Sequence, residues 1–124
     1  MSGMSLEQVR RNLERAGARY LEQWRDDDGD LVLGFERDDT KFVAILLGER
    51  NKRYAACMLI AGFAGRYDDS FASDLNRSLT FAKAVLPGRG DGIMIGYSFP
   101  LERLNDESVS MLATVYLMDL ARLS

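Results

Sequence analysis

The chain has 124 residues, a length that suits one domain with its own hydrophobic core. Hydrophobic residues make up 47% of it and the formal net charge is −3, a composition typical of a folded globule and unfavourable for binding nucleic acid. Histidine is absent and Cys57 is the single cysteine, which excludes the commonest general base, most zinc sites and an internal disulfide.

The amino-terminal half begins with an amphipathic pattern. Apolar residues recur at steps of three and four: Leu6, Val9, Leu13, Ala16 and Tyr20. This spacing predicts a helix with Ser5 as its N-cap and an end near Gly17. The polar stretch WRDDDGDL predicts a turn, and the strands LVLGFE, TKFVAILLG and YAACMLIAGFA follow, separated by turns at Asp38-Asp39 and ERNKR.

The carboxyl-terminal half contains two more helices and two more strands. Acidic residues and a serine at 68–70 suit the N-cap of a short helix over about Phe71 to Leu79. The strands TFAKAVLP and GIMIGYSF come next, and Asn105 or Asp106 caps a last helix. The order α-β-β-β-α-β-β-α predicts a single two-layer α+β domain over residues 1–124, with helices packed on a five-stranded, mainly antiparallel sheet.

Two motifs invite a chemical interpretation, and both are better explained as turns. In LPGRGDGIMI the glycines precede a strand rather than a helix, and the lysine of a phosphate loop is missing, so GRGDG predicts a hairpin. DDDGD at 26–30 resembles the start of a calcium loop, but Arg37 stands where that loop needs its glutamate. We therefore expect no catalytic, cofactor-binding or metal-binding residues and no enzyme.

The expected localisation rests on the length of the uncharged apolar segments. Charged residues interrupt any early secretion signal, and the longest uncharged run, over 54–65, is too short to cross a bilayer as a helix. We expect a cytoplasmic protein that contacts no membrane.

The central strands are unusual because they are apolar on both faces, whereas a two-layer sheet normally turns polar residues to water. The second and third strands carry no charge over 42–47 and 54–63. The last helix has few polar residues between Val109 and Leu123, so it is expected to be buried on more than one side. Three short helices cannot cover both faces, and the predicted uncovered surface includes the following residues: Val43, Ile45, Tyr54, Met58 and Ile60.

Several partners could keep water from this surface. A second copy of the chain, closing a two-fold dimer, is the first hypothesis. A captured segment of another protein or an apolar ligand is the second. The third is that the loops around Arg66–Ser70 and Leu101–Asn105 fold over it.

The stretch LNRSLTFAKAVLPGRGDGIMIGYSFPL, followed by an acidic-capped helix rich in leucine, resembles the YbjN family of bacterial sensory-transduction regulators. The likeness is strongest over 75–123 and looser before it. It implies the type III secretion chaperone-like fold, whose members are small acidic dimers that hold segments of other proteins. Relatives tend to show a second asparagine close to Asn76, where this chain has Ser78 and Thr80, and we assign Asn76 to helix termination.

Two functions remain open. The first is a non-enzymatic protein-interaction or chaperone-like module with a regulatory role. It would be a homodimer, with another protein as a second candidate partner, and it would bind by burial of the apolar surface or by strand addition at a sheet edge. The alternative is a small-molecule sensor with an apolar pocket between sheet and helices.

Overall fold

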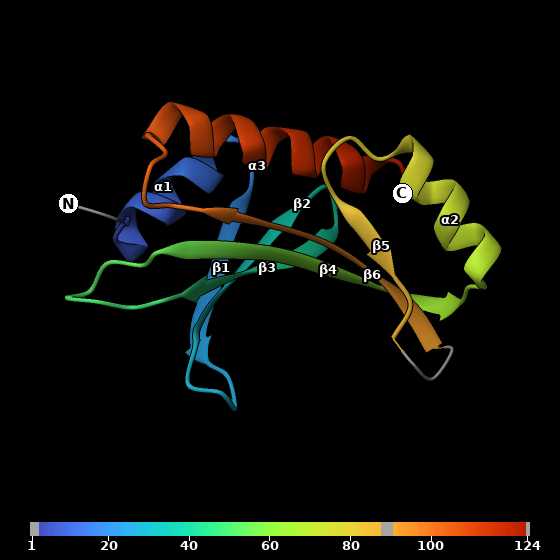
Figure 1. Ribbon diagram of the computed structural model, residues 1–124, viewed down its shortest axis with the longest axis horizontal. Helices are drawn as coiled ribbons and strands as arrows, with labels where there is room; N and C mark the ends of the chain where they lie inside the picture. The colour runs from blue at the N-terminus through green and yellow to red at the C-terminus, as the bar shows by residue number, and fades with distance from the viewer. Residues whose placement is uncertain (1–2, 88–90, 124) are drawn as a thin grey trace.

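A computed structural model describes residues 3–87 and 91–123 of the chain (Figure 1). These described residues form three helices and six strands: α1 (Leu6–Arg15), β1 (Arg19–Arg25), β2 (Leu31–Arg37), β3 (Thr40–Leu47), β4 (Ala56–Arg66), α2 (Asp69–Ser78), β5 (Lys83–Val85), β6 (Asp91–Pro100) and α3 (Asp106–Ala121). The predicted α+β class is confirmed. The sheet has one strand more than predicted, and the order is α-β-β-β-β-α-β-β-α.

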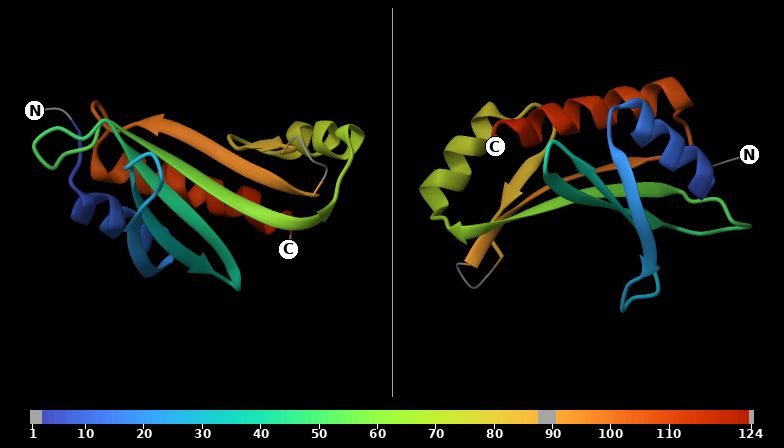
Figure 2. Two further views of the ribbon diagram at one scale, coloured as in Figure 1. Left: turned by 90° about the horizontal axis from the view of Figure 1, so that it is seen from below. Right: turned by 180° about the vertical axis from the view of Figure 1, so that it is seen from behind.

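All strand pairs of the sheet are antiparallel, in the order β1-β2-β3-β4-β6-β5. The three helices lie on the same face of this sheet, with α3 running across it and α1 and α2 near its two ends (Figures 1 and 2). Alternate strand residues point to this inner face and form the core with the helices. The largest of them are almost fully buried: Leu33, Phe35, Phe42, Leu46, Leu59, Ile93 and Ile95.

The additional strand is β1, which the sequence analysis divided between the first helix and a turn. The helix ends at Arg15, close to the predicted end near Gly17, and Gly17 reverses the chain with a φ of +104° that favours glycine. Tyr20 then packs edge-on against Phe35 of β2, with ring centroids 5.8 Å apart. Since nearly every side chain of β1 is partly or fully exposed, the strand lacks the apolar alternation by which strands are recognised.

The predicted helix starts are confirmed by their hydrogen bonds. Ser5 accepts from the Gln8 N–H and forms a capping box, and Asp68 accepts from the Phe71 N–H. Asn105, rather than Asp106, caps α3 by accepting from the Ser108 N–H. The last helix packs against the sheet and α1, but its remaining side exposes Met111 and Met118, so it is less buried than its composition suggests.

The predicted hairpin joins β5 to β6, which pair antiparallel with Ala84 opposite Ile95. Residues 88–90 of the GRGDG motif lie outside the described residues. Gly92 has a φ of +98°, and a Cβ there would lie 2.9 Å from the Phe63 carbonyl oxygen, so this position requires glycine. No helix in the described part of the chain is both long and apolar enough to cross a membrane.

Asp119 of α3 is buried, and its side chain binds the segment 80–82 that connects α2 to β5. Its two carboxylate oxygens accept three backbone N–H groups, from Thr80 at 2.9 Å, Phe81 at 3.1 Å and Ala82 at 3.0 Å. A buried carboxylate is stable only where donors replace its water, and these three amides do so. The interaction holds β5 and its connection against the helical layer.

Asn76 has a different role from the predicted helix termination. It lies inside the last turn of α2, and its side chain forms two hydrogen bonds with the backbone of Ala84 in β5. The amide nitrogen donates to the Ala84 carbonyl at 3.1 Å, and the amide oxygen accepts the Ala84 N–H at 2.6 Å. The side chain therefore pairs with the outer edge of β5 as a neighbouring strand would.

Replacing Asp119 should destabilise the protein strongly. Asp119→Ala removes the acceptor of three amide groups, so we expect a loss of about 3 kcal/mol in the free energy of unfolding, measured by urea denaturation. Asp74→Ala, which removes an exposed aspartate of α2 from an ion pair with Arg77, is the control and should cost less than about 1 kcal/mol. Equal losses in the two variants would contradict the anchoring role.

Replacing Asn76 should open the β5 edge locally. Asn76→Ala should cost about 1–2 kcal/mol and speed amide hydrogen exchange at Ala84, because both bonds to that residue are lost. Ser73→Ala, at an exposed position of the same helix, is the matched control. Unchanged exchange at Ala84 in Asn76→Ala would show that the side chain does not hold this edge.

Candidate interaction surface

The face of the sheet opposite the helices, here called the outer face, carries apolar side chains at its centre. Val43 and Ile45 of β3 lie opposite Ile60 and Met58 of β4 in the cross-strand register. We call these four residues the outer quartet. All four are partly exposed, and the ribbon views show no helix on this side (Figure 2). The four residues that the sequence pattern assigned to one surface are therefore neighbours in the structure.

Tyr54, which the sequence pattern placed with them, does not lie on the outer face. Strand β4 begins at Ala56, so the alternation does not extend back to Tyr54. Its backbone pairs with Met4 instead, through N–H···O bonds of 3.0 and 2.8 Å, and the side chain is only 5% exposed. We therefore leave Tyr54 out of the surface.

The apolar surface extends beyond the quartet over both ends of the sheet. Trp24 of β1 is 41% exposed, and Val85 of β5 and Met94 of β6 are 57% and 38% exposed. Trp24 is connected to the quartet by the register, since Val32 lies between it and Ile45 in neighbouring strands. Trp24 was not predicted because β1 lacks the alternation by which a strand is recognised. Val85 and Met94 were not predicted because the register that pairs β5 with β6 becomes visible only in the structure.

Two hollows flank the quartet on the outer face. One, of about 500 Å³, lies over β4, β6 and β5 and is lined by Met58, Ile60, Lys83, Val85 and Met94 among others. The other, of about 290 Å³, lies towards β1, and its lining includes Trp24, Val43 and Ile60. No residue of 66–70 or 101–105 lines either hollow, so these loops do not close the two hollows.

The acidic turn at 26–30 joins β1 to β2 as predicted. One carboxylate oxygen from each of Asp26, Asp28 and Asp30 lies within 4.8 Å of the others, so this is where the described residues could hold a cation. The turn itself accounts for the clustering, because Asp26 Oδ1 accepts the N–H groups of Asp28 at 3.0 Å and Asp30 at 2.9 Å. Asp28 is exposed, and Asp26 and Asp30 are partly exposed.

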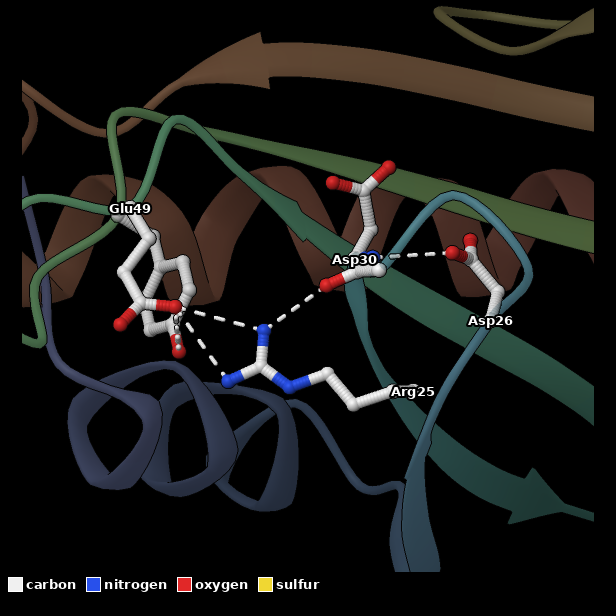
Figure 3. Close-up of polar contacts among 6 residues, drawn as sticks. Arg25, Asp26, Asp30 and Glu49 are labelled. Atoms are coloured by element: carbon white, nitrogen blue, oxygen red, sulfur yellow. Dashed lines mark hydrogen bonds and ion pairs between the residues drawn. The ribbon is translucent and has the colours of Figure 1, made fainter.

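Arg25 connects this turn to the loop after β3 (Figure 3). Its guanidinium donates to the Gly29 carbonyl at 3.0 Å and to Glu49 at 3.3 and 3.4 Å. Both side chains of the ion pair are about half exposed, so the pair positions the turn more than it stabilises the fold.

Two further buried groups, Cys57 and Tyr116, serve the packing of the core. Burial raises the pKa of the Cys57 thiol to about 12, which keeps it protonated and unreactive at neutral pH. Burial also raises the pKa of the Tyr116 hydroxyl, which donates to the Ile95 carbonyl at 2.7 Å and so ties α3 to β6. Neither group reaches a hollow of the outer face that could admit a substrate.

Comparison with family models matches residues 5–123 to YbjN, described as "Putative bacterial sensory transduction regulator". Neither the curated proteins nor the solved structures that were searched gave a match. The matched range includes every helix and strand from α1 to α3, so the resemblance noted in the carboxyl-terminal half extends over the whole domain. The chain belongs to the YbjN family.

Proposed function

We propose that this protein is a non-enzymatic regulator that works through protein contacts, as a homodimer joined by the outer face of its sheet. The observation that carries the proposal is the outer quartet, four adjacent apolar side chains on a face that no helix of the described residues covers. An apolar patch of this kind on a soluble domain is typical of a protein–protein contact.

The size of the surface suits a dimer. Six strands at the usual spacing of about 4.8 Å, and about seven residues of strand length at 3.3 Å each, give a flat area of roughly 600 Å². Stable interfaces bury about 800 Å² of accessible surface on each partner, and a corrugated face of this extent provides an area of that order. The methionines Met58 and Met94 would let the surface adapt to more than one partner.

The family description supports regulation rather than catalysis. A regulator has to pass its signal to another molecule, and an apolar protein-binding surface does this without any reactive group. The chaperone-like dimers implied by the resemblance would add a client protein as a further partner.

A second function rests on the larger hollow. Its wall is apolar apart from a few polar groups that include Lys83, which suits a small ligand with an apolar body and an acidic group. The sensor predicted from the sequence had its pocket between sheet and helices. Hollows of about 180 Å³ beside α3 and about 370 Å³ beside α1 lie there, and the larger hollow, of about 500 Å³, lies on the outer face. If the chain is a monomer in solution and binds such a ligand, the sensor function is favoured over the homodimer.

The proposal is tested by the mass of the protein in solution. Sedimentation equilibrium should give twice the subunit mass for the native chain. Ile60→Asp places a charge at the centre of the outer quartet and should raise the dimer dissociation constant at least 100-fold, by roughly 3 kcal/mol. Helix content, measured by circular dichroism, should stay unchanged because Ile60 is outside the core.

Met118→Asp is the matched control, since Met118 is an apolar residue exposed on the helical side. It should leave the dimer intact. A native chain that sediments as a monomer, or an Ile60→Asp variant that remains dimeric, would refute the proposed contact.

A further inference from the structure

One row of outward positions crosses all six strands of the sheet. Each residue of the row is the register partner of the next: Glu22, Gly34, Val43, Ile60, Gly96 and Lys83. The row begins with an acid on the edge strand β1 and ends with a base on the edge strand β5. Among the described residues, neither Glu22 nor Lys83 forms an ion pair within the chain.

The row has the same pattern read from either end, except for the sign of the charge. A charged residue is followed by a glycine and a branched aliphatic residue, and the midpoint falls between Val43 and Ile60. A two-fold axis through this midpoint and parallel to the strands exchanges the two ends of the row. It therefore brings the acidic end of one copy to the basic end of the other.

We propose that a second copy of this chain stacks on the outer face in reversed strand order, so that Lys83 meets Glu22 of the partner subunit. This arrangement rests on the proposed function and specifies its geometry. The two ion pairs stand at opposite edges of the interface, and the two outer quartets face each other at its centre. Stacked sheets lie about 10 Å apart, a distance that a lysine and a glutamate side chain span together.

The twist of the sheet limits the possible axes. A twisted sheet has the shape of a saddle. When the sheet is rotated by 180° about an axis along its strands, or about one across them, the rotated saddle curves in the same way as the original. Two such sheets stay in contact out to their corners, as in aligned sheet packing. A diagonal axis inverts the saddle, so that the sheets touch at the centre and separate at the edges.

Charge distinguishes the two axes that remain. An axis across the strands keeps the strand order, and it places Glu22 opposite Glu22 of the partner subunit and the two lysines opposite each other. Like charges face each other at both edges in that arrangement. The hydrophobic contact between the two quartets can form with either axis. Only the axis along the strands also gives attraction between opposite charges at both edges.

Charge reversal tests the arrangement in the full-length chain. Glu22→Lys and Lys83→Glu each turn both ion pairs of the dimer into repulsions, so each should raise the dissociation constant roughly tenfold at low salt. The double variant Glu22→Lys/Lys83→Glu restores opposite charges and should return the dissociation constant to near the native value. Sedimentation equilibrium measures all four proteins, and high salt should reduce the differences.

Glu102→Lys is the control for net charge, since Glu102 is exposed in the connection between β6 and α3. It changes the charge by as much as Glu22→Lys and should leave the dissociation constant unchanged. A native dimer whose single variants dissociate like the native protein would overturn the reversed stacking and leave the proposed function standing. A native monomer would overturn both.

Discussion

Both faces of the sheet are apolar at the centre, and the helices of the described residues cover only one of them. Each central strand alternates between the core and the outer face, so β3 contributes Phe42 and Leu46 inwards and Val43 and Ile45 outwards. A polar outer face would need only water. Because this one is apolar, the fold of one subunit leaves hydrophobic surface exposed, and the free energy of its burial is available for association.

Buried polar contacts fix the helices on the inner face. The Asn12 amide of α1 donates to Asp106 of α3 at 3.0 Å, Asp119 holds the amides before β5, and the Tyr116 hydroxyl reaches a carbonyl of β6. Each of these contacts joins two elements and would leave an unsatisfied buried group if the elements separated. The helical layer is thus unable to move over the outer quartet, and the exposure of that face is a property of the folded subunit.

Most of the fold and much of the surface could be predicted from local patterns. Ser5, Asp68 and Asn105 indicate helix starts because capping involves residues three positions apart. The outer quartet followed from strict alternation in two strands. Strand β1 was missed because an exposed edge strand needs no apolar period. The roles of Asn76 and Asp119 were missed because their partners lie 8 and up to 39 residues away, where only the folded chain brings them together.

The two edges of the sheet support the proposed stacking over strand addition. Asn76 occupies the backbone groups of Ala84, so β5 has little free edge to offer a new strand. At the other edge, β1 pairs with β2 through a register shift between Tyr20 and Glu22, and such an irregularity disfavours further pairing. A sheet with both edges disfavoured and one apolar face exposed can bury that face only against another surface. The opposite charges of Glu22 and Lys83 at its two ends make a copy of the same surface a complementary partner.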